Sequence, residues 1–343
     1  MFPELFEIPF VHWTVKSYGL MLVIAFLAAI TLIRRLSRDI TSDPQHITNA
    51  ALYSLIAGVI GARLFYVIHH LDQFKGNLLS AVAIWKGGLE LLGGVLLAIA
   101  VIGFYCRFYK LPVRRYLDIL AIGLMLSLVF GRVGCFLNGC CFGKLTDLPW
   151  AVRFPYRSDA YYSQVYPNPQ RNRPQPQLEL PNEFFGYYSE NGQELYGLKP
   201  YKDLTPQQQK YLADNDKYRC LPVHPAQLYS SVNGGVLAFL LYLFWRRGQK
   251  TGDSKNYKKK LFTKPGCTLG LMFILYGTTR FFIEFIRDDN PFEFSGLTIS
   301  QIIGVGMIIF GMLLMVIFEK MKPDLIANTP VLGKVKAAKQ SRN

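Results

Sequence analysis

Seven long apolar stretches constrain the fold of this chain more than any other feature of its sequence. Each approaches the roughly 20 residues that an α-helix needs to cross the hydrocarbon core of a bilayer. They lie at residues 18–33, 47–68, 87–105, 116–137, 225–245, 267–286 and 299–318. With 51% hydrophobic residues among 343, the chain is too apolar for a soluble globule of this size. The sequence therefore predicts an all-α polytopic membrane protein with seven transmembrane helices.

The basic residues predict the orientation of these helices. Lys and Arg gather in the loops after the first, third, fifth and seventh stretches, at residues 34–38, 107–115, 246–264 and 320–342. Because short loops rich in Lys and Arg stay in the cytoplasm, we expect the N-terminus outside and the C-terminus in the cytoplasm. The formal net charge of +15 is then explained by topology and by anionic lipid, and no nucleic-acid partner is expected.

A polar insert separates the fourth stretch from the fifth. It is rich in Tyr, Gln, Asn and Pro, and its proline steps between residues 166 and 176 favour loop over long helix. Residues 150–154 alternate like a strand. We expect transmembrane helices 1–4 in residues 1–139, an irregular extracytoplasmic head in 140–222, transmembrane helices 5–7 in 223–320, and a disordered cytoplasmic tail in 321–343.

The stretch Gly-Arg-Val-Gly-Cys-Phe-Leu-Asn-Gly at 131–139 ends the fourth apolar run and places Arg132 at the rim of the hydrocarbon. An arginine at the centre of a membrane helix costs roughly 2.5–3.5 kcal/mol, and less near the interface. Nearby glycines, among them Gly143, let backbone or ligand approach closely, and Asn138 adds an amide that donates and accepts. These residues indicate an anion site; an arginine that snorkels or pairs with a neighbouring helix is the alternative.

Other ionisable side chains at membrane depth are further candidates. Arg280, Glu284 and Arg287 are spaced i, i+4 and i+7 and share one helix face. Either Arg280 faces a phosphate while Glu284 orients it, or the two form a buried ion pair that holds helices together. Arg63 lies among small residues in the second stretch, where ligand binding and tight helix packing are both open. Glu90 lies in a glycine-rich run that suggests a broken helix lining a cavity.

Three residues open membrane helices on the predicted outer side. His224 and Gln227 lie one turn apart at the start of the fifth stretch. A histidine at the rim can transfer protons near neutral pH, although histidine is also common at interfaces. Tyr18 opens the first stretch, where a tyrosine of the interfacial aromatic belt is the simplest interpretation.

Four of the six cysteines, Cys135, Cys140, Cys141 and Cys220, fall on the predicted outer side. A disulfide from Cys140 or Cys141 to Cys220 would close the base of the head in an oxidising compartment, and Cys141 with Cys220 is the expected pair. A metal site is not expected, because the spacing matches no zinc pattern and no histidine is close in sequence.

Several of these motifs together resemble the family of bacterial prolipoprotein diacylglyceryl transferases. Residues 131–139 are similar to the family signature Gly-Arg-x-Gly-Asn-Phe-x-Asn-Gly-Glu, and residues 280–287 resemble Arg-x-x-x-Glu-x-x-Arg. His-Pro-Ala-Gln-Leu-Tyr at 224–229 resembles His-Pro-Ser-Gln-Leu-Tyr. Shorter similarities lie at 18–21, 61–63 and 85–94, so that six motifs follow in the right order over the membrane part but not over the head.

The resemblance implies transfer of the diacylglyceryl group of phosphatidylglycerol to the lipobox cysteine thiol of preprolipoproteins, the first step of lipoprotein maturation. The implied location is the bacterial cytoplasmic (inner) membrane. The implied partners are phosphatidylglycerol, the signal peptides of preprolipoproteins and membrane lipid, and no cofactor is expected. A non-catalytic lipid-binding paralogue of the same fold and, less in keeping with the motifs, a transporter are the alternatives.

The resemblance also assigns roles to individual residues. The expected catalytic residues are Arg132, Arg280, Glu284, His224 and Tyr18, with His224 ranked first as the base for the thiol. The residues expected to bind phosphatidylglycerol are Arg132, Asn138, Gly143, Arg63, Gln227 and Arg287. The chain departs from the family where Cys135, Cys140 and Leu92 stand in place of the usual Asn, Glu and His. The histidine has been proposed as the base, so its loss leaves the proton acceptor open.

Overall fold

The computed structural model describes most of the chain and divides it into two compact units. The described residues are 4–8, 13–40, 45–74, 81–82, 88, 90–190, 193–214, 218–252, 261–292 and 296–321. The first unit comprises Met1–Leu27, Leu124–Leu243 and Gly270–Met315, and the second comprises Ala28–Gly123, Phe244–Leu269 and Val316–Asn343. Several long helices begin in one unit and end in the other. Residues 322–343 of the predicted tail lie outside the described residues.

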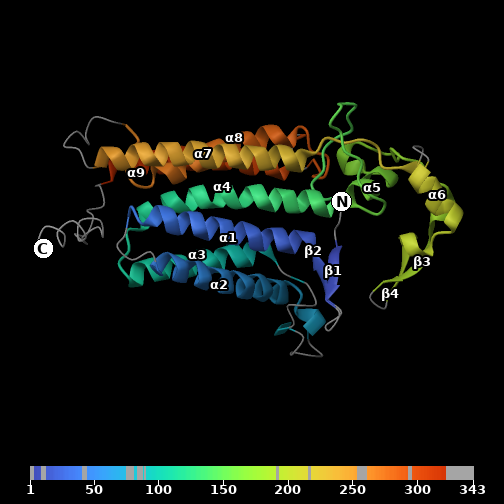
Figure 1. The fold of residues 1–343 in the computed structure, drawn as a ribbon, viewed down its shortest axis with the longest axis horizontal. Coiled ribbons are helices and arrows are strands. Elements are labelled where there is room, and N and C mark those ends of the chain that lie inside the picture. Colours follow the sequence, from blue (N-terminus) through green and yellow to red (C-terminus); the bar gives the residue numbers. More distant parts are fainter. Residues whose placement is uncertain are drawn as a thin grey trace, which may run out of the picture. The chain divides into compact units, whose positions relative to one another are not determined.

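Within the described part of the chain, seven long α-helices coincide with the seven predicted apolar stretches (Figure 1). They are α1 (Ser17–Ser37), α2 (Gln45–His69), α3 (Leu91–Phe108), α4 (Val113–Asn138), α7 (Ala226–Gly252), α8 (Cys267–Glu284) and α9 (Ile299–Lys320). Of these, α1, α2, α4, α7 and α9 are long and apolar enough to cross a membrane. In α3 the apolar helical segment, Leu92–Phe108, is shorter. The prediction of a helical, polytopic membrane protein is confirmed, and the number of seven spans stays a prediction. The fold is mostly helical rather than all-α, because antiparallel strand pairs accompany the helices.

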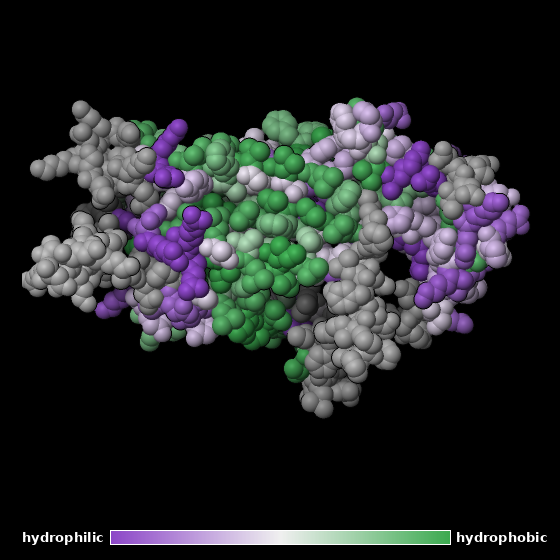
Figure 2. All heavy atoms as spheres, viewed as in Figure 1, coloured by the Kyte–Doolittle hydropathy of each residue, from purple (hydrophilic) through white to green (hydrophobic). Residues whose placement is uncertain are grey.

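The helices carry hydrophobic side chains on their exposed surfaces as well as in their contacts (Figure 2). Leu22, Val23 and Leu27 of α1 and Ile303, Ile309 and Leu313 of α9 are all exposed. Such surfaces are unfavourable in water but match lipid tails. A helix suits that environment because it satisfies its backbone polar groups internally. The helices are therefore suited to a bilayer all round rather than to a water-facing bundle.

In the second unit, α2 and α3 lie side by side (Figure 1). A Cβ added at Gly61 would lie 2.7 Å from the Cβ of Leu97 and closer still to the carbonyl oxygen of Gly93. Small residues at this crossing therefore let the two backbones approach closely, as is common between membrane helices. The Asp118 carboxylate accepts hydrogen bonds from the backbone N–H groups of Gly266 (2.8 Å) and Leu269 (3.1 Å) and caps the start of α8.

Within the glycine-rich run at 85–94, helix α3 begins at Leu91, later than the predicted apolar stretch that begins at residue 87. Gly88 and residues 90–94 are described, and Glu90 is extended, with φ −102° and ψ 117°, directly before α3. Its carboxylate lies 2.8 Å from Nδ1 of His69.

In the first unit, polar side chains and small residues connect the helices. Ser231 of α7 donates a hydrogen bond to the carbonyl of Val129 in α4 (2.9 Å), and Asn233 donates to Thr279 of α8 (3.0 Å). The first turn of α9 is closed by a reciprocal capping box, in which Thr298 and Gln301 each accept a backbone N–H of the other. These contacts position the ends of α4, α7, α8 and α9 at which the candidate site lies.

The insert between α4 and α7 is more regular than the sequence predicts. It contains α5 (Asp159–Val165), the antiparallel hairpin β3 (Phe185–Glu190) and β4 (Gln193–Leu198), and α6 (Pro206–Asp214). Residues 166–176 form no long helix, as predicted, but the strand expected at 150–154 is reduced to one bridge between Val152 and Val223. Aromatic and aliphatic side chains spread through the insert supply a buried core, which allows the ordered elements to form.

Before α1, β1 (Glu4–Ile8) and β2 (Trp13–Lys16) form an antiparallel hairpin that the sequence analysis did not predict.

Candidate functional site

Two arginines from different helices of the first unit line one small cavity. Arg132 projects from α4 and Arg280 from α8, and the cavity is completed by Leu128, Ser230, Asn233, Tyr276 and Ile283. Arg132 makes no hydrogen bond or ion pair with any described residue. Arg280, by contrast, donates to Oγ of Ser300 (2.7 Å) and lies 2.6 Å from a carboxylate oxygen of Glu284. The structure thus brings together the two arginines that the sequence analysis singled out.

Glu284 is the anchor of this arrangement, because its buried carboxylate is held from several sides. One oxygen accepts hydrogen bonds from Nδ2 of Asn290 (2.6 Å) and from Oγ1 of Thr298 (2.9 Å). The other oxygen pairs with Arg280 and lies 3.8 Å from Nε of Arg287. A carboxylate that is satisfied in this way has little freedom to move, so it orients Arg280 while pairing with it. Of the two sequence-based interpretations, the ion pair of Arg280 with Glu284 is observed, and a phosphate facing Arg280 stays a prediction.

Arg287 follows directly after α8 and is paired to Asp289. Its Nε donates to Oδ1 at 2.8 Å, and its Nη2 contacts the second carboxylate oxygen in a two-pronged pair. With Arg280 held by Glu284 and Arg287 held by Asp289, the guanidinium of Arg132 carries the charge left without a counterpart among these five residues. Such a surplus favours an anion beside Arg132.

Asp288 connects this segment to the insert, since its carboxylate lies 3.1 Å from Nη1 of Arg173. Burial raises the pKa of the Asp288 carboxyl above its ordinary value, while Arg173 opposes the shift.

Gly143 lets three backbone segments converge beside the site. Its N–H donates to the carbonyl of His224 (3.1 Å), and the next N–H, of Lys144, donates to the carbonyl of Ile286 (2.7 Å). A Cβ at Gly143 would lie 2.6 Å from the Cβ of His224, so glycine is required for this approach. Nδ1 of His224 lies 3.3 Å from the hydroxyl of Tyr229, which also accepts a hydrogen bond from the indole of Trp150 (2.7 Å). The imidazole of His224 therefore lies beside a hydroxyl that a second hydrogen bond holds in place.

The end of α4 is held by Gln227. Gln227 is almost fully buried, and its Nε2 donates to the carbonyl of Cys140 at 2.6 Å. Its Oε1 has no hydrogen-bond partner among the described residues. Asn138 is the last residue of α4, and Gly139 then takes a left-handed conformation (φ +80°) that ends the helix and reverses the chain.

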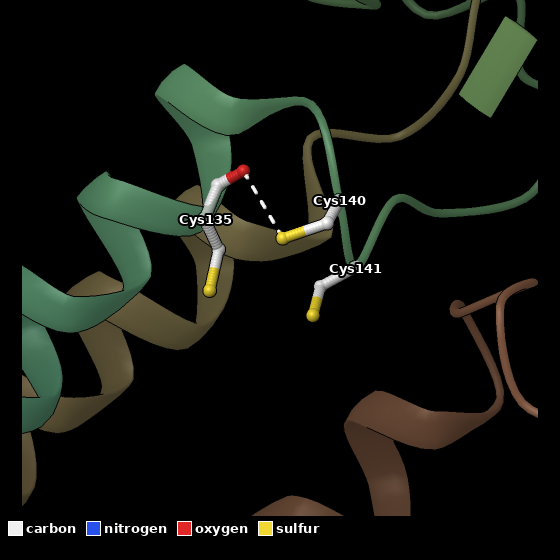
Figure 3. A group of neighbouring side chains, drawn as sticks. All are labelled: Cys135, Cys140 and Cys141. Atoms are coloured by element: carbon white, nitrogen blue, oxygen red, sulfur yellow. Dashed lines mark hydrogen bonds between the residues drawn. The ribbon is translucent and has the colours of Figure 1, made fainter. Parts of the chain in front are cut away.

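This reversal gathers three cysteines that the sequence spacing does not suggest as a cluster (Figure 3). The sulfur atoms of Cys135, Cys140 and Cys141 all lie within 4.8 Å of one another. The thiol of Cys140 also faces the carbonyl oxygen of Cys135 at 3.7 Å. Hydrogen bonds from the thiols of Cys135 and Cys140, together with the positive charges of nearby arginines, lower the pKa of the Cys141 thiol. Gly139, directly before Cys140 and Cys141, is the sequence signal that indicates such a chain reversal.

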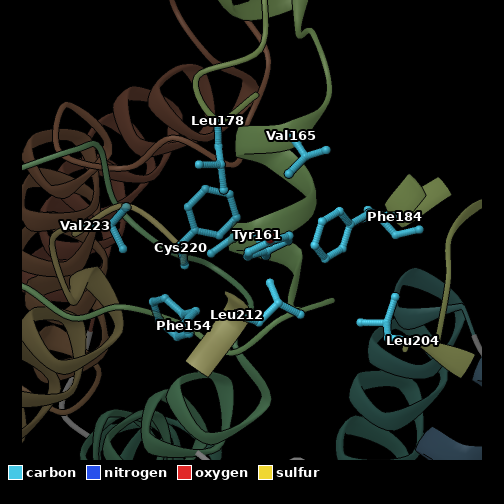
Figure 4. Packing of buried hydrophobic residues seen from close by; sticks show 12 residues of the cluster. Phe154, Tyr161, Val165, Leu178, Phe184, Leu204, Leu212, Cys220 and Val223 are labelled. Atoms are coloured by element: carbon cyan, nitrogen blue, oxygen red, sulfur yellow. The ribbon is translucent and has the colours of Figure 1, made fainter. Parts of the chain in front are cut away.

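The disulfide expected between Cys141 and Cys220 is absent, and both are free cysteines. Cys220 is buried in the hydrophobic core of the insert, close to Phe154 and Tyr161 (Figure 4), whereas Cys141 belongs to the cluster at the end of α4. Burial raises the pKa of the Cys220 thiol to about 11. Packing in two different environments, rather than sequence position at the two ends of the insert, decides where these sulfur atoms lie.

The remaining predicted residues divide between the two units. Tyr18 of α1 packs against Gly134 of α4 and lies within electrostatic reach of Arg132 and the three cysteines. Arg63 belongs to the second unit and donates to the carbonyls of Ala81 and Gly88. Its predicted role in lipid binding therefore stays a prediction. Sequence analysis missed Ser300, Asn290, Thr298 and Asp289, polar residues that no motif distinguishes.

Comparisons with known proteins agree with the motifs. A family model described as prolipoprotein diacylglyceryl transferase matches residues 3–317. The phosphatidylglycerol–prolipoprotein diacylglyceryl transferase of Proteus mirabilis (strain HI4320) is 30% identical over 328 residues, which cover 92% of each protein. The enzyme of the same name from Buchnera aphidicola subsp. Acyrthosiphon pisum (strain 5A) is 29% identical over 325 residues, 92% of this chain and 96% of that protein. That of Clostridium tetani (strain Massachusetts / E88) is 27% identical over 314 residues, 91% and 95% of the two proteins.

Proposed function

The chain belongs to the prolipoprotein diacylglyceryl transferase family, and on that basis we propose that Arg132 and Arg280 bind the phosphate of phosphatidylglycerol during transfer. The enzyme transfers the diacylglyceryl group of phosphatidylglycerol to prolipoproteins and is a multi-pass membrane protein. One observation carries the proposal: Arg132 lines the same cavity as Arg280 and has no partner among the described residues. Guanidinium groups match phosphate oxygens through paired hydrogen bonds.

The proposed reaction breaks a glycerol C–O bond to phosphate and forms a C–S bond to the lipobox cysteine. The thiolate sulfur attacks the carbon of the diacylglyceryl group, and the electron pair of the broken bond leaves with the phosphate oxygen of glycerol phosphate. Negative charge therefore builds on the leaving phosphate. Two guanidinium groups held in place before the reaction stabilise that charge best where water is excluded.

Further residues of the first unit have supporting roles in this proposal. Glu284 orients Arg280, and His224, with its ring beside Tyr229, accepts the proton of the substrate thiol. Tyr18, which lies within electrostatic reach of Arg132, completes the proposed catalytic set. The phosphatidylglycerol site at the end of α4 is shaped by Asn138, Gly143, Gln227 and Arg287. Gln227 and Gly143 hold the backbone there, and Arg287 is held in place by Asp289.

We place the protein in the bacterial inner membrane with seven spans, the N-terminus outside and the insert extracytoplasmic. The support is the concentration of Lys and Arg at 34–38, 107–115, 246–264 and 320–342. In this orientation Arg132 lies near the outer end of α4. There it would meet both the phosphatidylglycerol headgroup and the cysteine of a preprolipoprotein, at the first step of lipoprotein maturation.

Mass spectrometry of a lipobox peptide tests the proposal. The purified protein is incubated with the peptide and phosphatidylglycerol, beside an Arg132→Ala variant and a peptide with serine in place of cysteine. We expect a diacylglyceryl mass gain on the cysteine peptide alone, strongly reduced in the variant. No gain from a folded protein that still binds phosphatidylglycerol would instead support a non-catalytic lipid-binding protein.

A further inference from the structure

The three cysteines at the end of α4 form a compact donor set that the reaction outlined above leaves unused. Their sulfur atoms lie within 4.8 Å of one another, although one comes from the last turn of α4 and two from the segment after it. Figure 3 shows the three side chains around one shared space. In the described part of the chain, this is the group of His, Cys, Asp and Glu side chains whose geometry suits a metal ion.

The backbone holds the three thiols in this arrangement. Gly139 reverses the chain at φ +80°, and Cys141 itself occupies the left-handed region at φ +60°, which is uncommon for a residue with a side chain. The buried amide of Gln227 fixes the carbonyl of Cys140 at 2.6 Å. A non-glycine residue in this region costs free energy and persists where its surroundings hold it. The sulfur atoms are therefore brought together by the fold and not by a chance choice of rotamers.

Thiolate donors select soft or borderline cations such as Zn²⁺ and Cu⁺. With a Zn–S bond of about 2.3 Å, tetrahedral coordination places the sulfur atoms about 3.8 Å apart, which side-chain rotation reaches from the observed cluster. Three protein ligands leave one tetrahedral position open, and an open position is the mark of a catalytic rather than a structural zinc site.

We propose that Cys135, Cys140 and Cys141 bind one zinc ion, and that its fourth position takes the cysteine thiolate of the prolipoprotein substrate. The second part rests on the proposed function. Three thiolates and one Zn²⁺ carry a net charge of −1, and the guanidinium groups of Arg132 and Arg287 are positive charges that act on the Cys141 sulfur. The remaining charge of −1 therefore lies near two positive side chains, of which Arg287 also pairs with Asp289.

The position of the cluster matches the geometry of the reaction. Arg132 and Cys135 are three residues apart on α4 and lie on the same face of the helix. A phosphate held by Arg132 and a sulfur held at the metal are therefore neighbours. The diacylglyceryl carbon of phosphatidylglycerol is joined to that phosphate through the oxygen that leaves.

The chemistry balances without an oxidant or a reductant. When the substrate thiol binds zinc, its S–H bond breaks, and the proton passes to His224 or to water. The sulfur lone pair then forms the C–S bond while the C–O bond breaks with its electron pair going to the phosphate. The thioether product is a weaker ligand than the thiolate, so it leaves the metal. A metal deprotonates a bound thiol outright. It therefore supplies the thiol activation that Leu92, which stands in place of the family's histidine, cannot.

Metal analysis of the full-length protein tests the site itself. Protein purified in detergent under reducing conditions is supplied with Zn²⁺, washed, and measured by elemental mass spectrometry. We expect one zinc per chain, lost in Cys135→Asn and in Cys141→Ala but kept in the matched control Cys106→Ala, a free cysteine of α3. Asparagine is the residue usual at position 135 in the family resemblance, so Cys135→Asn is expected to fold, and circular dichroism with gel filtration checks this.

Cobalt substitution tests the open position. Co²⁺ bound to thiolates absorbs through sulfur-to-metal charge transfer, and we expect that absorption to increase when a lipobox peptide with cysteine is added. The serine peptide is expected to leave the spectrum unchanged. The same spectrum in Arg132→Ala should still respond to the cysteine peptide, because the arginine holds phosphate and not metal.

The outcomes separate this inference from the proposed function. Absence of zinc and cobalt binding, or binding that survives Cys135→Asn and Cys141→Ala, overturns the metal site; so does binding of Cu⁺ alone. Full transfer activity in chelator-treated, metal-free protein overturns thiol activation by zinc and leaves the proposed function intact. Unchanged transfer in Arg132→Ala overturns the phosphate site, whatever the metal result.

Discussion

Arg63 of α2 and Arg132 of α4 both lie in apolar membrane helices, yet the chain surrounds them differently. The buried guanidinium of Arg63 donates to the carbonyls of Ala81 (2.7 Å) and Gly88 (2.9 Å). It also lies over the rings of Tyr66 and Phe74, at 5.4 and 5.5 Å from their centroids. Arg132 makes no such contact with a described residue and lines a cavity beside a second arginine.

This contrast separates two ways of keeping a charge at membrane depth. For Arg63 the cost is offset by the backbone and aromatic groups of the chain, as expected of a structural arginine. For Arg132 no described residue supplies a hydrogen bond or an ion pair, as expected of an arginine that binds an anion. Each substitution below tests one side of the contrast.

The largest effect is expected for Arg132→Ala. Removing one preorganised contact to a developing negative charge lowers the rate of transfer by about 10²–10³. The thermal stability of the protein should change little, because no contact within the described chain is lost. Transfer to a lipobox peptide and thermal unfolding measure the two properties.

Arg132→Lys is the matched control, since it keeps the charge but lacks the planar fork. We expect it to retain more activity than alanine and less than arginine. A transfer rate for Arg132→Ala equal to that of the unchanged protein would contradict the assignment.

Arg63→Ala should show the opposite pattern. The substitution leaves the carbonyls of Ala81 and Gly88 without this donor, which costs roughly 1–3 kcal/mol of stability for each group left buried and unsatisfied. We expect a lower unfolding temperature with the Michaelis constant for phosphatidylglycerol nearly unchanged. Weaker lipid binding at unchanged stability would instead support the sequence-based prediction that Arg63 binds lipid.

The close packing next to Arg63 gives a second test of its structural surroundings. Gly61→Ala forces a methyl group against Gly93 and Leu97, and overpacking of this kind costs about 1–3 kcal/mol. Gly103→Ala in α3 is the control, because nothing lies within 4 Å of the added Cβ. Equal unfolding temperatures for the two variants would show that the α2–α3 crossing yields without strain.

The smallest effect is expected for Ser300→Ala. Ser300 is a hydrogen-bond partner of Arg280, the second arginine that lines the cavity. Ser300→Ala removes the hydroxyl that accepts from its Nη2 at 2.7 Å, while the ion pair with Glu284 remains. A hydrogen bond to a charged group is worth about 1.5–3 kcal/mol, of which positioning should account for roughly a tenfold loss in the transfer rate. Loss of activity as large as that of Arg132→Ala would show that the position of Arg280 matters as much as the presence of Arg132.

Much of the site could be predicted because its motifs are local. The i, i+4 spacing of Arg280 and Glu284 puts them on one helix face whatever surrounds that helix, and their 2.6 Å pair confirms it. The partners Asn290, Thr298 and Ser300 could not be predicted, since they come from the turn and helix that follow and depend on how that turn folds back.

The insert and the cysteines show the same limit. The sequence correctly predicts no long helix between residues 166 and 176. The hairpin β3–β4 was not predicted, because it forms where dispersed side chains such as Phe184 and Leu198 meet in one core. Cys141 and Cys220 bracket the insert in sequence, and yet they lie in different environments.

The apolar helices and the arginines within them can be read from the sequence alone, because hydropathy is a property of contiguous residues and the bilayer acts on each segment separately. Which arginine is satisfied, which carboxylate orients it, and which cysteines meet can be read only from the folded chain. Those outcomes depend on chain reversals such as the one at Gly139 and on close approaches such as the one at Gly143. There, residues distant in sequence supply or withhold the partner that a buried polar group requires.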